Sequence, residues 1–124
     1  MLNDTDAIAT IAVTDIAVAG KFYEGMLGLK PVATKEQDVL TYKSGDSEIL
    51  VYKSQYAGTN QATAVTWIVD DVEGAVQALK AKGVRFERYD LPGTTRQGDV
   101  HLSGNLKNAW CKDPDGNILA IVGG

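Results

Sequence analysis

Few side chains in this sequence have the chemistry of a catalyst. His101 is the sole histidine among 124 residues, so a general base would have to be this residue or a carboxylate with a shifted pKa. It either lies partly exposed in a hairpin or faces a pocket. Cys111 is the sole cysteine, which favours packing in a strand over reactivity. Asp113 and Asp115 flank a proline and precede a glycine, so turn formation explains them best. We predict no catalytic residue.

Aromatic side chains are better candidates for a binding role. Trp110 and Tyr42 fall on predicted strands of opposite halves of the chain, where each side chain lies either in a pocket or in the core. Trp67 falls on a strand face that should meet a helix, so we expect it in the core. The polar connection over residues 90–97 is suited to a lid, and its Arg96 either pairs with an anionic ligand or is solvated.

Composition limits the partners of the protein. A hydrophobic content of 44% in 124 residues supports one domain with a core of its own. The net charge of -4 and the pI of about 4.8 disfavour nucleic acid and anionic membrane surfaces. Three features predict a cytoplasmic protein. The chain has a single cysteine, its first residues show no basic segment followed by an apolar run, and it has no apolar stretch of membrane-spanning length.

An internal repeat organises the elements that would position these residues. Residues 11–16 (IAVTDI) correspond to residues 67–72 (WIVDDV) at a constant shift of 56 positions. In both copies an apolar strand runs into an aspartate that can cap a helix, and the helices are predicted over residues 16–27 and 72–82. The two predicted caps are Asp15 and Asp71.

Strand-like runs separated by turn residues follow each helix. The chain is therefore predicted to be α+β, with two tandem βαβββ modules forming a curved mixed sheet around a cavity. Module one covers about residues 7–55, a linker about 56–61, and module two about 62–124. The expected strands are 7–13, 30–34, 39–43, 48–53, 62–69, 84–89, 100–102, 106–112 and 117–122.

Alternation along the two opening strands predicts which residues line the cavity. One parity places Ile8, Thr10 and Ala12 of the first strand on a common face. The corresponding residues of the second opening strand are Ala64, Thr66 and Ile68. The opposite parity, which contains Trp67, should meet the helices. Both faces are largely apolar, which suits a sheet that is covered on one side and lines a recess on the other.

Three motifs give the chain a recognisable family resemblance. They are Val13-Thr14-Asp15 with Phe22-Tyr23 and Leu27 to Pro31, Val69-Asp70-Asp71 with Leu79 to Val84, and Ala109 to Asn117 (AWCKDPDGN). In this order and spacing, across nearly the whole chain, they resemble the vicinal oxygen chelate superfamily. That superfamily includes glyoxalase I, extradiol dioxygenases, methylmalonyl-CoA epimerase, and fosfomycin and bleomycin resistance proteins.

The resemblance implies four metal-binding positions, two on opening strands and two on closing strands. On the opening strands these positions hold Ile8 and Ala64. On the closing strands they hold Ile49 and Ala120, if the two strands are aligned through Gly45 and Gly116 at a shift of 71 positions. None of these side chains has a lone pair for a cation. A one-residue slip would introduce Glu48, which supplies a single ligand and turns the strand over. We therefore expect no metal and no cofactor.

These expectations favour a metal-independent protein that binds a small organic molecule, similar in construction to bleomycin resistance proteins that sequester drugs. The resemblance implies a homodimer with the ligand between subunits. The ligand-binding candidates are Ile8, Thr10, Tyr42, Ile49, Ala64, Thr66, Arg96, His101, Trp110 and Ala120. The alternative is a glyoxalase-, epimerase- or dioxygenase-like enzyme, in which a metal binds elsewhere or is not needed. A third possibility is a regulatory module whose cavity is filled by its own side chains.

Overall fold

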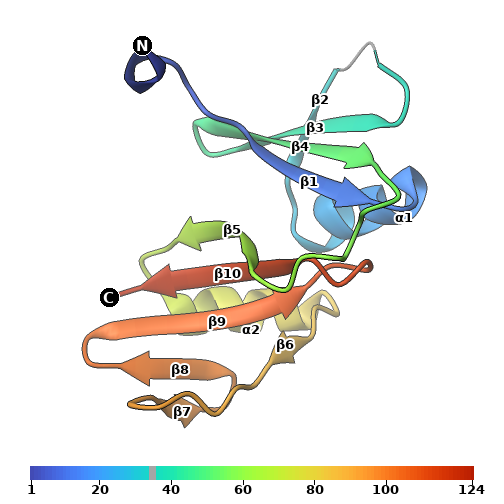
Figure 1. Cartoon of the computed structure of the whole chain (residues 1–124). Coiled ribbons are helices and arrows are strands. Elements are labelled where there is room, and N and C mark those ends of the chain that lie inside the picture. The colour runs from blue at the N-terminus through green and yellow to red at the C-terminus, as the bar shows by residue number, and fades with distance from the viewer. Residues whose placement is uncertain (34–35) are drawn as a thin grey trace.

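The computed structural model describes residues 1–33 and 36–124, and these residues form two mixed sheets in succession along the chain (Figure 1). The first sheet has the order β1-β4-β3-β2, and the second has the order β5-β10-β9-β8-β7, with β6 paired to β9. In both sheets the opening strand lies parallel to the closing strand. The strands are β1 Ala9–Val13, β2 Lys30–Val32, β3 Val39–Ser44, β4 Ser47–Lys53, β5 Thr63–Ile68, β6 Phe86–Glu87, β7 Thr95–Gln97, β8 Val100–Ser103, β9 Leu106–Lys112 and β10 Ile118–Gly123.

The helices begin at the two aspartates that the repeat predicts. Asp15 Oδ1 accepts hydrogen bonds from the backbone N–H groups of Ala17 and Val18, and Asp71 Oδ1 accepts one from Gly74. Both caps satisfy N–H groups that have no partner within the helix, so both predictions are confirmed. The helical elements are η1 Leu2–Asp4, α1 Ile16–Gly20, its π-helical continuation η2 Lys21–Met26, and α2 Val72–Ala81.

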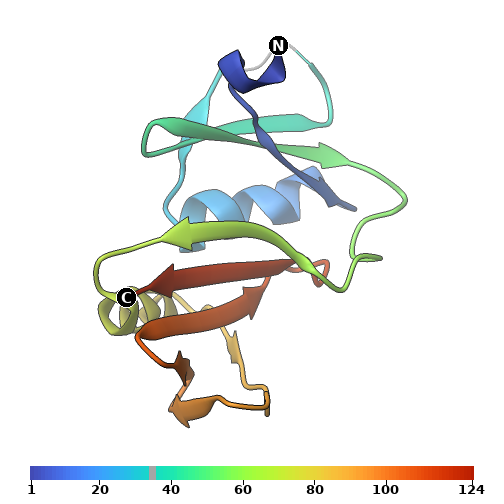
Figure 2. The ribbon, with the colours of Figure 1, turned by 60° about the vertical axis from the view of Figure 1, so that its left-hand side comes forward.

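The core lies on the helix side of each sheet, as the alternation of apolar residues predicts. Ile11, Val13 and Val51 of the first sheet are at most 2% exposed and pack with Phe22 and Tyr23 of η2. In the second sheet, Ala109 and Ile121 pack under α2. Figure 2 shows α1 and η2 between the first sheet and strand β5, so the helix of module one also lies next to module two.

The α+β class and the two-module construction are confirmed, and three details differ from the prediction. The modules form two separate sheets instead of one curved sheet. Part of the connection predicted as a lid, residues 90–97, forms strand β7 and pairs with β8, because its backbone groups complete the edge of the sheet. Strand β6 is confined to Phe86–Glu87 within the predicted run 84–89. The predicted strand 30–34 ends beyond the described residues.

The turn between β9 and β10 fastens module two to module one. Asp115 accepts hydrogen bonds from the backbone N–H and hydroxyl of Thr14, at 3.1 and 2.6 Å. Asn117 Nδ2 donates to the carbonyl of Ala12 at 2.7 Å, and the hydroxyl of Tyr23 donates to Asp113 Oδ2 at 2.6 Å. The turn predicted for these aspartates is confirmed, and its side chains also bond to residues about a hundred positions earlier in the chain.

Asp99, in the turn just before β8, joins α2 to the segment after β6. Its carboxylate is 8% exposed and lies 2.7 Å from Lys80 Nζ and 2.9 Å from Arg88 Nε. The hydrogen bond from Lys80, assisted by Arg88, lowers the pKa of Asp99 against the opposing effect of burial. A lowered pKa means that the ionised form stabilises the fold above about pH 4, and that this contribution is lost as the pH falls through the folded-state value.

Asp99→Asn should therefore lower the free energy of unfolding by about 1–2 kcal/mol at pH 7, because two hydrogen bonds to a charged group lose their charge assistance. Urea unfolding of both proteins at pH 7 and pH 3 would measure this effect, and the difference should shrink at pH 3. Glu73→Gln, which removes the charge from the more exposed pair with Lys107, is the matched control and should have a smaller effect. An equal difference at both pH values would contradict the assignment.

Across residues 1–33 and 36–124, no helix combines the length and the apolar character needed to cross a membrane.

Candidate functional site

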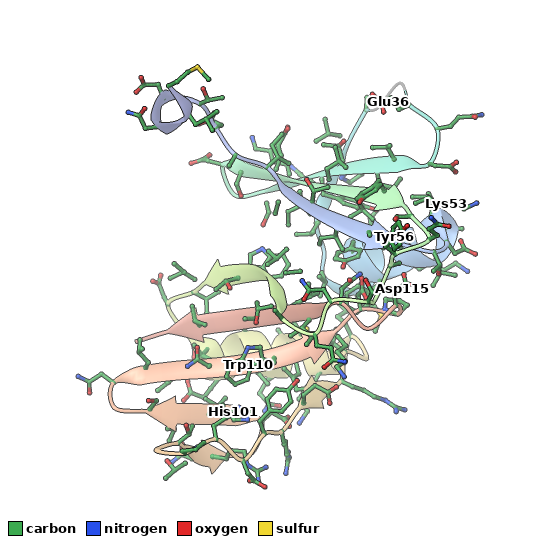
Figure 3. The ribbon with its side chains drawn as sticks, in the orientation of Figure 1. Glu36, Lys53, Tyr56, His101, Trp110 and Asp115 are labelled. Atoms are coloured by element: carbon green, nitrogen blue, oxygen red, sulfur yellow. The ribbon has the colours of Figure 1, made fainter. Side chains whose placement is uncertain are left out.

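Within residues 1–33 and 36–124, each sheet has one face that no helix of its own module covers, and we call these the open faces. On the second sheet, strand pairing places Trp110 opposite Ala120, and His101 opposite both Asn108 and Arg96. Directly paired residues point to the same side of a sheet, so these side chains belong to one open face. His101 and Trp110 lie on neighbouring strands of this sheet in Figure 3.

Three rings form an aromatic cluster on this open face. The ring centroids are 4.8 Å apart for His101 and Trp110, 5.5 Å for Tyr89 and Trp110, and 5.8 Å for Tyr89 and His101. The two contacts of Trp110 are edge-to-face, which is a favoured geometry for aromatic pairs. Trp110 remains partly exposed while His101 is fully buried, so the cluster presents the indole to solvent on a rigid support.

His101 acts as that support. Its Nε2 accepts a hydrogen bond from the backbone N–H of Tyr89 at 2.9 Å, which leaves the proton on Nδ1, 3.3 Å from the carbonyl oxygen of Asn108. Both ring nitrogens are occupied by backbone groups, so this histidine is not arranged to bind a metal or to take a proton from a ligand. Its side chain is 0% exposed, which corrects the expectation of a partly exposed hairpin residue.

Arg96 supplies a positive charge at the edge of the same face. Its side chain is 34% exposed, and Nη2 lies 3.4 Å from an oxygen of Asp90, whose side chain is 96% exposed. An ion pair of this length with a solvated carboxylate contributes little. The guanidinium is therefore able to pair with a polar or anionic group of a ligand.

The other predicted residues are divided between the two sheets. Ala64 and Thr66 are exposed on β5, and Ala120 of β10, which pairs with Thr66, is buried on the same face. Ile8 and Thr10 lie on the open face of the first sheet, where Ile8 is 48% exposed. The structure thus gathers Ala64, Thr66, Arg96, His101, Trp110 and Ala120 on one open face, and Ile8 and Thr10 on the other.

Tyr42 and Ile49 do not lie on an open face, which corrects two predictions. They pair with each other on the helix side of the first sheet and are 1% and 2% exposed. Burial, together with the charge of Glu24, raises the pKa of Tyr42. Packing against the module one helix explains the position of both side chains.

The error at Ile49 has a definite cause. Ile49 pairs with Ala9, and Leu119 pairs with Val65, which lies 56 positions after Ala9. The closing strands therefore correspond at a shift of 70, not 71, and the open-face counterpart of Ala120 is Leu50. The two hairpins before the closing strands differ in length, and β10 has an irregularity between Ile118 and Leu119. A glycine-to-glycine alignment could not account for either feature.

Sequence reasoning also missed two residues of the open faces. Tyr89 was assigned to a strand but not to the site, because its contact with Trp110 depends on the short pairing of β6 with β9. Glu87 pairs with Trp110, and Tyr89 follows Glu87 by two residues, so alternation along the strand places Tyr89 on the same face as Trp110. This inference requires the pairing of β6 with β9 to be known. Glu48 lies on the open face beside Ile8, so the strand does not need to turn over to present it.

The family model for the glyoxalase/bleomycin resistance protein/dioxygenase superfamily matches residues 6–121. The chain belongs to this superfamily. The match spans both modules, including the opening strands, the capped helices and the turn between β9 and β10. No curated protein matches the sequence.

Solved structures of the superfamily have the same fold. A glyoxalase/bleomycin resistance protein from Catenulispora acidiphila superposes with a TM-score of 0.72 at 19% identity, covering 96% of this chain and 97% of the other. A lactoylglutathione lyase from Agrobacterium tumefaciens has a TM-score of 0.68 at 17% identity, covering 97% and 93%. A fosfomycin resistance protein from Mesorhizobium loti has a TM-score of 0.68 at 12% identity, covering 100% and 94%. At these identities the likeness shows the fold alone.

Proposed function

We propose that this superfamily member binds a small organic molecule on its open faces without a metal ion, as a homodimer that sequesters a drug or a metabolite. The observation that carries the proposal is the chemistry of the open faces. Ile8, Ala64, Ala120 and, after the correction of register, Leu50 occupy the positions that the resemblance assigns to metal ligands, and all four side chains are hydrocarbons.

The donor set does not fit the metal that the superfamily resemblance implies. Zinc and related cations need three or four nitrogen, oxygen or sulfur ligands at about 2 Å. Glu48 offers one carboxylate beside Ile8, and its strand neighbour Lys43 is a cation. In the described part of the chain, no group of three or more His, Cys, Asp or Glu side chains is placed to hold a metal ion.

The aromatic cluster indicates what kind of molecule the open face takes. Trp110 presents a partly exposed indole, held by edge-to-face contacts with Tyr89 and His101, and a rigid aromatic surface suits a planar group. Arg96 lies on the same face with a weak partner and suits a polar or anionic substituent. A planar organic molecule with a polar edge matches both features.

A second copy of the chain is the partner that the open faces favour. The open faces carry large apolar side chains that are at least 36% exposed, and such clustering is typical of interaction surfaces. A second copy would cover these side chains and enclose a ligand against Trp110. They are Ile8, Val32, Tyr52, Ile68 and Leu106.

Native mass spectrometry of freshly purified protein, prepared without chelators, tests the proposal in one measurement. We expect a homodimer, far less than one metal ion per chain, and added mass from an organic molecule that denaturation releases. A stoichiometric transition metal that survives dialysis would contradict metal independence and would favour the alternative of a glyoxalase-, epimerase- or dioxygenase-like enzyme.

A further inference from the structure

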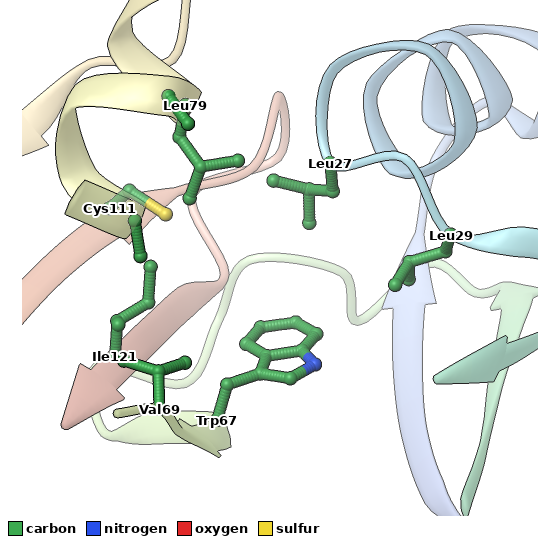
Figure 4. Close-up of a pocket in the computed structure, with 9 residues that line it drawn as sticks. Leu27, Leu29, Trp67, Val69, Leu79, Cys111 and Ile121 are labelled. Carbon is green, nitrogen blue, oxygen red and sulfur yellow. The ribbon is translucent and has the colours of Figure 1, made fainter. Parts of the chain in front are cut away.

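An apolar hollow lies on the helix side of the molecule, where the two modules meet. Leu27 and Leu29 enter it from module one, and Trp67, Leu79, Cys111 and Ile121 enter it from module two (Figure 4). Its volume is about 250 Å³. Trp67 and Cys111 point to the helix side of the second sheet, whereas Trp110 points to the open face, so this helix-side chamber is separate from the aromatic cluster.

Among the residues that the structure describes, those lining the helix-side chamber include no charged side chain. Its thiol, on Cys111, stays neutral because burial, with contributions from the nearby carboxylates of Asp113 and Glu87, raises its pKa to about 12. The indole N–H of Trp67 already donates to the hydroxyl of Ser44 at 2.8 Å, so this side chain offers its ring to the chamber. A charged ligand would lose its hydration here without finding a partner.

The size of the helix-side chamber limits the ligand further. A dry apolar cavity of about 150 Å³ holds a benzene molecule, so the larger volume here suits a bicyclic aromatic ring system. Ala78, an exposed residue of α2, lies at the edge of the lining and marks the side on which the chamber meets solvent. The chamber therefore has an entry as well as an apolar interior.

We propose that the helix-side chamber binds a small uncharged bicyclic aromatic molecule between the two modules. The ring stacks or packs against Trp67 and contacts leucines from both modules, so the bound molecule links them. This site is independent of the open faces and of any metal.

Titration of the full-length protein with indole, followed by the nitrogen and proton resonances of the Trp67 indole N–H group, tests this site. The Trp110→Phe variant assigns the two indole resonances. We expect a saturable shift of the Trp67 resonance with a dissociation constant on the order of 0.1 mM, which is normal for a ligand of this size. Indole-3-acetate should bind at least tenfold more weakly, because its carboxylate has no partner in the chamber.

Two matched variants of α2 locate the binding. Ala78→Leu adds hydrocarbon at the edge of the chamber and should weaken indole binding at least tenfold, whereas Ala81→Leu, also exposed on α2 but outside the lining, should leave it unchanged. Both positions are exposed, so neither variant should fail to fold. No saturable shift, or equal binding by both variants, would overturn the site. Loss of the Trp67 shift in Trp110→Phe would also overturn the helix-side site, because it would assign indole binding to the open face. A metal ion in the purified protein would contradict only the proposed function and not this site.

Discussion

Asp113→Ala is expected to lower the free energy of unfolding by about 3–5 kcal/mol, because the substitution removes the acceptor of four hydrogen bonds at a buried site. The carboxylate is 5% exposed and accepts from the hydroxyl of Tyr23, from the backbone N–H groups of Asp115 and Asn117, and from Asn117 Nδ2. Its loss leaves the buried hydroxyl of Tyr23 without this acceptor. That residue lies in the other module, so the variant should also loosen the contact between modules.

Urea unfolding followed by tryptophan fluorescence would measure the loss at Asp113. Asp46→Ala is the matched control, because Asp46 is an exposed turn aspartate in the hairpin between β3 and β4, and its removal should leave the unfolding midpoint unchanged. A loss below about 1 kcal/mol for Asp113→Ala would mean that water replaces the carboxylate and that the modules are held together by apolar packing instead.

Asp113 also shows how far the sequence could predict the fold. The nearby proline and glycine predict a tight turn, and the structure confirms it through the hydrogen bonds that the backbone N–H groups of Asp115 and Asn117 donate to Asp113. These contacts are local, so spacing reveals them. The bond to Tyr23 spans 90 positions and depends on how the modules pack, and no local pattern encodes that arrangement.

The same distinction explains the candidate site. The helix caps at Asp15 and Asp71 and the two faces of β1 follow from periodicity and were predicted correctly. The position of Ile49 depended on the relative register of two hairpins, and one residue of error moved it from the core to the expected recess. The aromatic cluster requires β6, β8 and β9 to be neighbours, which the order of elements along the chain does not determine.

Ile68→Asp should raise the dissociation constant of the proposed homodimer at least 100-fold. Ile68 is 85% exposed on the open face, on β5, which is the edge strand of the second sheet and pairs with β10. Twofold symmetry would place the new carboxylate in the interface twice, and a buried carboxylate without a partner carries a large desolvation penalty. Because Ile68 is exposed in the monomer, we expect the fold of the monomer to be unchanged in Ile68→Asp, and circular dichroism would verify this.

Sedimentation velocity at about 10 µM protein would distinguish dimer from monomer for each variant. At this concentration, a 100-fold change in a micromolar dissociation constant strongly changes the fraction of dimer. Val18→Asp provides the control, because Val18 is also a β-branched apolar residue, 44% exposed, but lies on α1 away from the open faces. The dimer should persist in this variant. A dimer that survives Ile68→Asp would place the dimer interface elsewhere on the molecule. If the unmodified protein is a monomer, the open faces are not covered by a second copy, and a ligand would have to bind to Trp110 from solvent.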